Sequence, residues 1–348
     1  MSSHFTKISF QKYPKTNPNH QMKTMTKSIS GILKVLCILF ITSCCTKETP
    51  SEIPDDNLPK IYDYNVLIVP DLSNRINPEI HPKPLNDTLL INTIADHIDN
   101  LLKIKSRQMN QLDIYKFDFI NRGILNQHIA NTEDLEINFR KFKDQAQEAS
   151  HYKRHDLKPD IASFKNNIAK VYDYSLAHSA GSDVWNYFNQ NIKNSMINEP
   201  DKKVEIAKDE FVITGTRNIA VLFTDGYIES ANNSSGLRLD QDLIKKIRKE
   251  FVSSGSVDLE KFILSKPEYL IRKTSDLNQL NVIVFEMVDR SLDKNGVTTV
   301  QPTDFEIMKI IWKKWLKDSG AAQVEIYPAL TNKTEAYEAL KKFMEEIK

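Results

Sequence analysis

Two short polar segments follow apolar runs in this sequence and carry the side chains best suited to chemistry. Asp71 and Ser73 follow the run 66–69, and Asp225 follows the run 218–223. Two carboxylates with hydroxyls between them are hard oxygen ligands, suited to Mg²⁺ or Mn²⁺. Without a cation the carboxylates would repel each other, and one would tend to take up a proton. The residue types therefore indicate a cation site, or a site in which the negative charge of the carboxylates is neutralised in another way.

The elements that must position these side chains are strands. Continuous apolar runs of this length are typical of strands buried on both faces, as in a parallel sheet between helices. Strand and helix patterns alternate from residue 62 onward, which predicts an α/β fold with a doubly wound, mostly parallel central sheet. Ligands bind outside the carboxyl ends of such strands, so neighbouring strands would bring Asp71 and Asp225 together. The strands expected are 66–69, 111–119, 123–129, 218–223, 281–288 and 323–327.

Apolar residues at helical spacing predict the helices that flank the sheet. Asn86 or Asp87 is a candidate N-cap for the first of them. Thr303 and Glu306 have the spacing of a capping box, and Gly320 is a natural end for the helix that they open. The helices expected span 90–102, 243–251, 304–320 and 332–347, and the segment 132–200 is helical in character.

Composition excludes several classes of site. The 348-residue chain is 40% hydrophobic with a net charge of +1, which gives no reason to expect nucleic-acid binding. Its three cysteines, Cys37, Cys44 and Cys45, all lie near the N-terminus, so no later residue can form a disulfide. His151 and His155 have the i,i+4 spacing of zinc ligands, but the neighbouring lysine and arginine favour a solvated helix face. The sequence contains no P-loop or dinucleotide fingerprint.

The N-terminal segment 1–43 is interpreted as a signal peptide. Lysines precede an apolar stretch that is shorter than the ~20 residues a bilayer span needs. About forty residues before the processing site is long for such a signal. Starting at Met22 or Met25 would give an ordinary length, so residues 1–21 are interpreted as a mis-assigned start or an untranslated extension.

The end of that signal, the tetrapeptide 41–44, resembles the bacterial lipobox, which implies cleavage before Cys44 and lipidation of Cys44. Residues 44–61 are rich in proline and acidic residues and are expected to form a flexible tether. Cys45 stands where aspartate would favour the inner membrane. By resemblance to the sorting rule of diderm bacteria, this implies a lipid-anchored envelope protein of the outer membrane.

The two polar segments together resemble the metal-ion-dependent adhesion site of the von Willebrand factor A family. That site consists of D-x-S-x-S after the first strand, a threonine in a middle loop and an aspartate in a TDG-like turn. Asp71 and Ser73 match the first two positions, and Asp225 in the tripeptide 224–226 matches the last. Ser182 is the candidate for the middle hydroxyl. The resemblance covers 62–348 and implies Mg²⁺ or Mn²⁺ held by these four residues.

Two departures from the family pattern affect this interpretation. The gap between Asp71 and Asp225 is long and implies an insertion around 130–210. Arg75 stands where the family has the second serine of its first motif. Its side chain either points outward and leaves the four ligands to bind metal with added waters, or places its guanidinium in the cation position, paired with both aspartates.

The resemblance implies a non-enzymatic protein that binds a protein partner at the top of the sheet. Where metal is bound, an acidic residue of the partner would complete the coordination of the cation. One alternative is a metal-free scaffold or assembly component of the envelope, with Arg75 replacing the cation. The other is a metal-dependent hydrolase, which ranks lower because the sequence offers no positioned general base.

Overall fold

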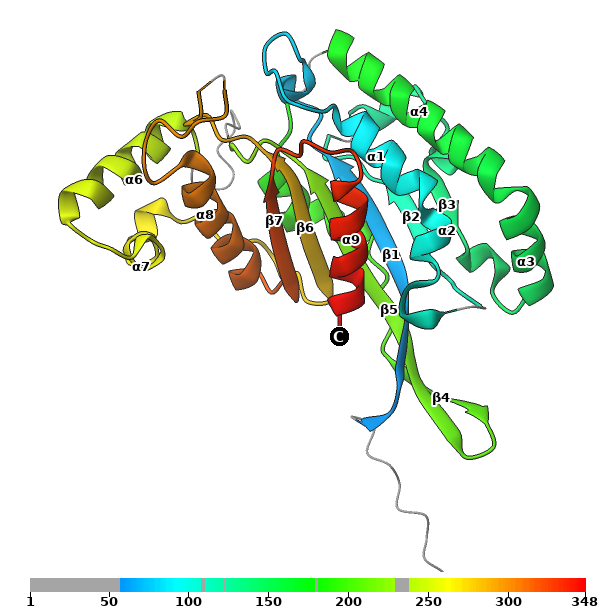
Figure 1. Cartoon of the computed structure of the whole chain (residues 1–348). Helices are drawn as coiled ribbons and strands as arrows, with labels where there is room; N and C mark the ends of the chain where they lie inside the picture. The colour runs from blue at the N-terminus through cyan, green and yellow to red at the C-terminus, as the bar shows by residue number, and fades with distance from the viewer. Residues whose placement is uncertain (1–56, 108–109, 122, 179–180, 229–237, 294) are drawn as a thin grey trace, which may run out of the picture. The chain divides into compact units, whose positions relative to one another are not determined.

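The computed structural model describes residues 57–107, 110–121, 123–178, 181–228, 238–293 and 295–348 (Figure 1). The signal peptide, Cys44 and the tether up to residue 56 lie outside the described residues, so lipidation stays a prediction. Within the described ranges, each helix is too short or too polar to cross a membrane.

The central sheet has the strand order β3-β2-β1-β5-β6-β7, and helices cover both of its faces (Figure 1). β2 pairs with β3 in the antiparallel sense, β4 forms an antiparallel hairpin with β5, and the other neighbouring strands are parallel. This confirms the predicted doubly wound, mostly parallel α/β fold. The strands are β1 (Lys60–Pro70), β2 (Ile114–Phe117), β3 (Glu136–Asn138), β4 (Lys202–Ala207), β5 (Glu210–Phe223), β6 (Leu280–Met287) and β7 (Gln323–Pro328).

The strand order reverses between β1 and β5. From β1 the chain first adds β2 and β3 on one side, and it then returns to add β5, β6 and β7 on the other. Such a reversal is the topological switch point, where open α/β sheets bind their ligands outside the carboxyl ends of the strands. Asp71 directly follows one of the two strands that flank this point, and Asp225 is the second residue after the other.

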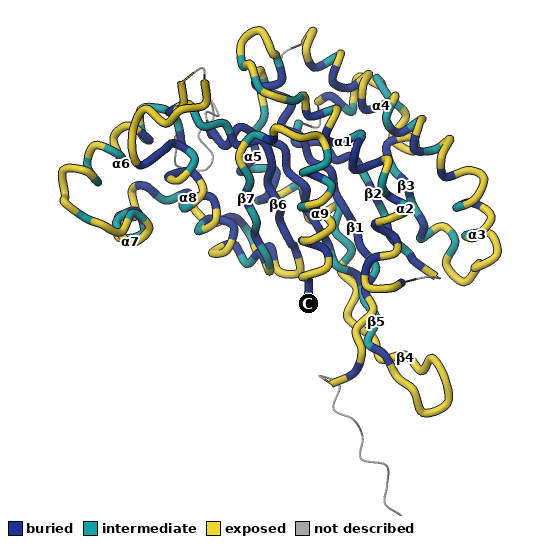
Figure 2. Tube along the Cα trace, in the orientation of Figure 1, coloured by how far each residue is buried: buried dark blue, intermediate teal, exposed yellow. Residues whose placement is uncertain are grey.

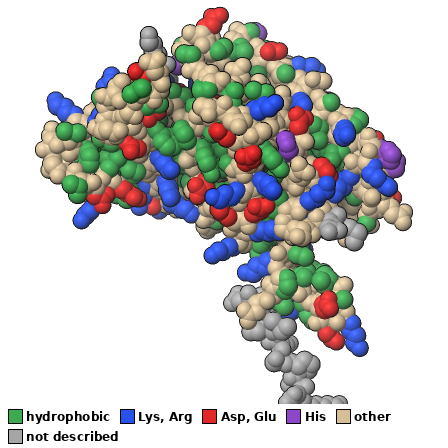
Figure 3. Space-filling model, in the orientation of Figure 1, with side chains coloured by type: hydrophobic (Ala, Val, Ile, Leu, Met, Phe, Trp, Pro, Cys, Tyr) green, Lys and Arg blue, Asp and Glu red, His purple; other side chains and the backbone are tan. Residues whose placement is uncertain are grey.

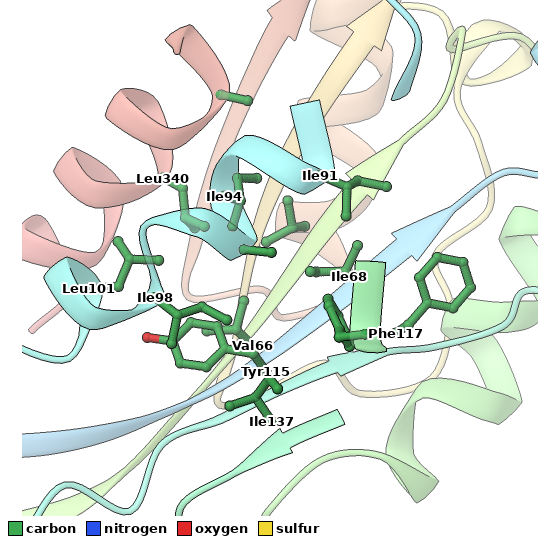
Figure 4. Close-up of a cluster of buried hydrophobic side chains, with 14 of the residues drawn as sticks. Val66, Ile68, Ile91, Ile94, Ile98, Leu101, Tyr115, Phe117, Ile137 and Leu340 are labelled. Carbon is green, nitrogen blue, oxygen red and sulfur yellow. The ribbon is translucent and has the colours of Figure 1, made fainter. Parts of the chain in front are cut away.

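The central strands are buried (Figure 2), and their alternate side chains face opposite layers of the core, one of which is shown in Figure 4. Val66 and Ile68 lie in one apolar cluster, whereas Leu67 and Val69 lie in the other. The first cluster is covered by α1 (Asp87–Asp96), α2 (Ile98–Leu101), α4 (Leu157–Ala177) and α9 (Glu335–Glu346), and α3 (Ala146–His155) adds Tyr152. The second is covered by α5 (Val184–Asn186), α6 (Gln241–Ser254), α7 (Leu259–Leu264) and α8 (Asp304–Asp318).

Short helical turns connect these elements. They are the 3₁₀ turns Asn74–Ile76, Ile104–Ser106, Leu125–Gln127, Thr132–Leu135, Arg140–Phe142, Ile192–Asn194 and Pro267–Tyr269, and the π-helical turn Tyr187–Asn191. The predicted helix 90–102 is interrupted at His97, where φ is −106° and ψ is 11°. The capping box at Thr303 and Glu306 is confirmed, and Gly320 follows α8 with φ of +100°.

The prediction of a strand at 123–129 is wrong. Asn121 opens a turn there, because its carbonyl accepts from Ile124 N at 3.2 Å and its side chain accepts from Gly123 N at 2.9 Å. His128 has a left-handed backbone, with φ of +52°, that a strand does not allow. Ile124 and Ile129 nevertheless pack against the first apolar cluster, so these apolar residues belong to a loop that packs on the core rather than to a strand. The partner of β2 is β3 instead.

Candidate functional site

The loops after β1 and β5 lie side by side at the carboxyl edge of the sheet. The two strands are parallel, with Pro70 opposite Phe223. Asp71 N donates to Phe223 O at 2.9 Å, and Thr224 Oγ1 donates to Asp71 Oδ2 at 3.1 Å. The first of the two predicted aspartates is therefore bonded directly to the loop that carries Asp225.

Asp71 is 4% exposed, and both of its carboxylate oxygens accept hydrogen bonds. Ser73 N donates to Oδ1 at 3.0 Å, and Thr224 donates to Oδ2. Thr224 Oγ1 in turn accepts from Gly226 N at 3.3 Å. Thr224 supplies a hydroxyl that sequence reasoning did not assign to the site, although it belongs to the quoted tripeptide 224–226.

Arg75 points into the protein and is 4% exposed. Its Nε donates to Asp71 O at 2.9 Å and lies 3.7 Å from Asp71 Oδ2. Its Nη2 donates to Phe223 O at 2.7 Å and to the carboxylate of Asp87. Burial by itself would lower the pKa of Arg75, but the charges of Asp87 and Asp71 raise the pKa above its ordinary value. The outward alternative for Arg75 therefore does not apply.

Asp87 is one of several residues of this cluster that the sequence did not indicate as site residues. It begins α1, is 1% exposed, and accepts from Arg75, from Lys83 and from Tyr172 Oη at 3.1 Å. Burial tends to raise the pKa of Asp87, but Arg75 and Lys83 outweigh it and lower the pKa. Its candidate role was an N-cap. Asn86 occupies that position instead and makes no side-chain cap bond.

Glu286 extends the cluster from β6. It is fully buried and has φ of +73°, a left-handed conformation that is unusual for a residue with a side chain. Glu286 Oε1 accepts from Leu330 N at 2.9 Å, and Oε2 lies 3.8 Å from Lys83 Nζ. Among the described residues, Oε2 has no hydrogen-bond partner. Burial and the charge of Asp87 raise the pKa of Glu286 to about 7.

The carboxylate of Asp225 forms an ion pair with another arginine, Arg290. It is 8% exposed, and its carboxylate accepts from Tyr227 N and from Arg290 Nη2, each at 3.1 Å. The guanidinium of Arg290 also stacks on the ring of Tyr227, 3.8 Å from its centroid. Burial and the charge of Asp71 raise the pKa of Asp225 to about 6, against the opposing effect of Arg75 and Arg290.

A pocket of about 250 Å³ opens beside the two aspartate loops. Ile80 at its edge is 58% exposed, and the side chain of Arg290 is 29% exposed. The pocket therefore joins the buried cluster to the surface at the switch point. Its lining consists of Arg75, Ile80, His81, Pro82, Lys83, Asp225, Val288 and Arg290.

Ser182, the candidate for the middle hydroxyl, lies just before α5. Asn121 Nδ2 donates to the carbonyl of Gly181, the residue before Ser182, at 3.0 Å. Asp183, the residue after Ser182, caps α5 by accepting from Asn186 N at 2.9 Å. The Ser182 hydroxyl is buried and has no hydrogen-bond partner among the described residues. It therefore makes no hydrogen bond to Asp71 or Asp225, and the hydroxyl bonded to Asp71 is that of Thr224.

The residues at this edge fit an internal guanidinium better than a divalent cation. The carboxylate oxygens of Asp71 and Asp225 already accept from protein donors, and Arg75 supplies the positive charge beside Asp71. A cation bound to the Asp71 carboxylate would lie beside the guanidinium of Arg75, whose Nε is 3.7 Å from Asp71 Oδ2.

Comparisons with known proteins do not add to this geometry: no protein-family model and no curated protein matches the chain. The resemblance to the von Willebrand factor A family therefore rests on the residues quoted for it and stays a prediction. The insertion around 130–210 and the metal roles of Asp71, Ser73, Ser182 and Asp225 stay predictions with it.

Proposed function

We propose that this protein is a lipid-anchored envelope protein whose von Willebrand factor A-like domain binds a protein partner without a metal ion. The partner would bind at the carboxyl edge of the sheet, where the pocket lies at the topological switch point. The observation that carries the proposal is the buried guanidinium of Arg75, bonded to Asp71 O, Phe223 O and Asp87.

Arginine is well suited to replace a cation that holds loops together. It keeps its charge at all relevant pH values and offers five N–H donors in a fixed plane. Here the donors of Arg75 bond three segments: the loop after β1, the end of β5 and the start of α1. The loop arrangement that the family pattern assigns to a metal is thus fixed by a side chain of the protein itself.

The partner contact that the pocket supports is with an acidic side chain. Arg290 lies at the surface end of the pocket, and Asp225 is its carboxylate partner. A carboxylate from a partner protein can take the place of Asp225 on Arg290 through a charge-assisted hydrogen bond. Lys83 and His81 line the same pocket. An acidic residue of the partner would therefore meet an arginine where the family pattern offers a metal ion.

The hydrolase alternative finds less support. His81 lines the pocket with Asp225 and could serve as a base, whereas Glu286 is enclosed. The described residues that line the pocket include no Ser, Thr or Cys nucleophile. With Arg75 beside Asp71, the residues also do not fit a metal that would activate water. Binding is therefore the function that the site supports best.

The metal-free part of the proposal is tested by thermal melting of the full-length protein in detergent with EDTA, Mg²⁺ or Mn²⁺. We expect the wild-type midpoint to be the same in all three, because Arg75 already occupies the position beside Asp71. A midpoint that rises with millimolar Mg²⁺ or Mn²⁺ in the wild type would overturn this part. Arg75→Ser, which restores the family's serine, is the comparison: a rise in this variant alone would show that the arginine replaces a cation.

The binding part is tested by photo-crosslinking in cells. A photoreactive phenylalanine analogue replaces Ile80 at the pocket edge, or Val257, which is fully exposed between α6 and α7, as the control. We expect a discrete protein adduct from position 80 that is lost in the Arg290→Glu variant, and none from position 257. Identical adduct patterns at both positions would contradict a binding site at this edge.

A further inference from the structure

The β4–β5 hairpin extends beyond the rest of the sheet (Figure 1). The first part of β5 pairs with β4 and β1, and β6 joins β5 only from Asn218 onward. Every residue of β4 is exposed. The hairpin therefore lies outside both apolar clusters; Val212 is buried but belongs to neither of them.

Large apolar side chains are nevertheless exposed on this hairpin. Val204 is 40% exposed, Ile206 60% and Phe211 37%, and Ile61 on the adjoining part of β1 is 44% exposed. Hydrophobic side chains are visible on the projecting hairpin in Figure 3. Exposed apolar groups that gather on one projection mark a contact with another surface.

The hairpin carries features that oppose pairing with another strand. β4 is an edge strand, and its first two residues are lysines. The register shifts between Glu205 and Ala207, which indicates a bulge. Lysines and bulges on an edge strand prevent further strands from adding to it. The apolar side chains are therefore better explained by a surface that contacts side chains than by a strand that pairs with the backbone.

The chain enters the sheet at the same end. β1 begins at Lys60, which is opposite Ile213 near the base of the hairpin. Cys44 precedes Lys60 by sixteen residues, which span at most about 55 Å when fully extended. A lipid on Cys44 would keep the hairpin within that reach of the bilayer, at a high effective concentration. This step rests on the lipid anchor of the proposed function.

We propose that the β4–β5 hairpin rests on the bilayer that holds the lipid anchor. Val204, Ile206 and Phe211 enter the interfacial region, while Lys202 and Lys203 extend toward the phosphate groups. The decapeptide from 202 to 211 has three lysines and three acidic residues, so charge contributes little and the apolar contact depends on the anchor.

This contact would orient the partner site. Asp71 lies at the opposite end of β1 from Lys60, and an eleven-residue strand spans about 33 Å. With the hairpin on the membrane, the carboxyl edge and its pocket face away from the bilayer. A partner that approaches from the aqueous side would then meet Arg290 and Ile80 directly.

The test places a fluorophore on the hairpin of the full-length lipoprotein. Ile206→Cys is labelled with an environment-sensitive dye in a Cys45→Ser background and reconstituted into phosphatidylcholine–phosphatidylglycerol vesicles. Val257→Cys, labelled in the same way, is the matched control because Val257 is fully exposed elsewhere. We expect a shift to shorter emission wavelength at position 206, with quenching by nitroxide-bearing lipids several-fold stronger than at position 257.

Vesicle flotation before the measurement tests the lipid anchor separately from the contact of the hairpin with the bilayer. Protein that does not float overturns the lipid anchor and, with it, the hairpin contact. Protein that floats but shows equal quenching at both positions overturns the hairpin contact and leaves the anchor standing. A blue-shifted dye at position 206 that nitroxide lipids do not quench would identify a second copy as the occupant instead, and would also overturn the contact with lipid.

Discussion

Arg75 is a buried arginine at a position where the pattern that the sequence resembles has a serine. Its guanidinium lies beside Asp71 and is bonded to Asp87. Asp87 is fully enclosed, and Arg75 and Lys83 compensate its buried negative charge. A buried ion pair is weak evidence for stability, but removing one partner leaves an uncompensated buried charge.

Arg75→Met should therefore be strongly destabilising, by about 3–5 kcal/mol, because Asp87 and Asp71 would lose their shared guanidinium. Urea unfolding of the full-length protein in detergent measures the change. Arg238→Met is the control, since Arg238 pairs with Asp240 at the surface and should change stability by less than about 1 kcal/mol. Equal effects of the two substitutions would show that the buried guanidinium has no special role.

Glu286 should make stability depend on pH. Its pKa is raised to about 7 in the folded protein, from an unfolded value of 4.5. Below pH 4.5, Glu286 is protonated in both states and does not lower the free energy of unfolding. Above pH 4.5, the free energy of unfolding falls as the pH rises, until Glu286 also ionises in the folded protein above pH 7. At about 1.4 kcal/mol per pKa unit, the loss is about 3 kcal/mol.

Glu286→Gln should remove that loss, because glutamine keeps an acceptor for Leu330 N and does not ionise. We expect the stability of the variant relative to wild type to rise by up to about 3 kcal/mol between pH 5 and pH 8, measured by urea unfolding. Glu338→Gln on an exposed part of α9 is the control and should give no such trend. A constant difference for Glu286→Gln across this range would contradict the raised pKa.

At the scale of elements, local chemistry fixes where α8 begins. Thr303 Oγ1 accepts from Glu306 N at 3.1 Å, and Glu306 Oε2 accepts from Thr303 N at 2.7 Å. Both bonds join residues three apart, which is why their spacing in the sequence predicted them. The strand expected at 123–129 had no comparable local signal, since apolar residues also occur in a loop that packs on the core.

Thr303→Ala should lower the free energy of unfolding by about 1 kcal/mol, because it removes the cap of α8. Asn86→Ala is the matched control: Asn86 precedes α1 but makes no side-chain cap bond, so its replacement should have a much smaller effect. Thermal or urea unfolding of both variants distinguishes them. A smaller loss at Thr303 than at Asn86 would contradict the assignment of the capping box.

At the scale of the whole molecule, the two layers of the core share the same strands. Val66 and Leu67 are neighbours in β1, yet they belong to opposite apolar clusters. Loss of one layer exposes strands that the other layer needs for its own packing. The residues from 57 to 348 should consequently unfold in one transition.

All three tryptophans of the chain, Trp185, Trp312 and Trp315, lie in the second cluster and provide a selective probe of that layer. Leu340→Ala alters α9 in the first cluster and should cost about 2–5 kcal/mol. We expect tryptophan fluorescence and far-ultraviolet circular dichroism to report the same lowered midpoint. A tryptophan transition that stays at the wild-type midpoint would show that the layers unfold separately.

The sequence by itself determined the fold class, the central strands and the ends of α8. These features depend on periodicity, burial and contacts between residues close in sequence. It also indicated that Asp71 and Asp225 follow apolar strands, and the parallel pairing of β1 with β5 places their loops together.

Only the tertiary structure decided the direction of Arg75 and its pairing with Asp87. It also decided the enclosure of Glu286 beside Lys83, and the hydrogen bond from the Thr224 hydroxyl to Asp71. These contacts join segments whose approach depends on loop paths and on the order of strands in the sheet, and no spacing in the sequence encodes either. The physical reason is that burial sets the strength of a charge pair, and burial at this edge exists only after the layers have packed.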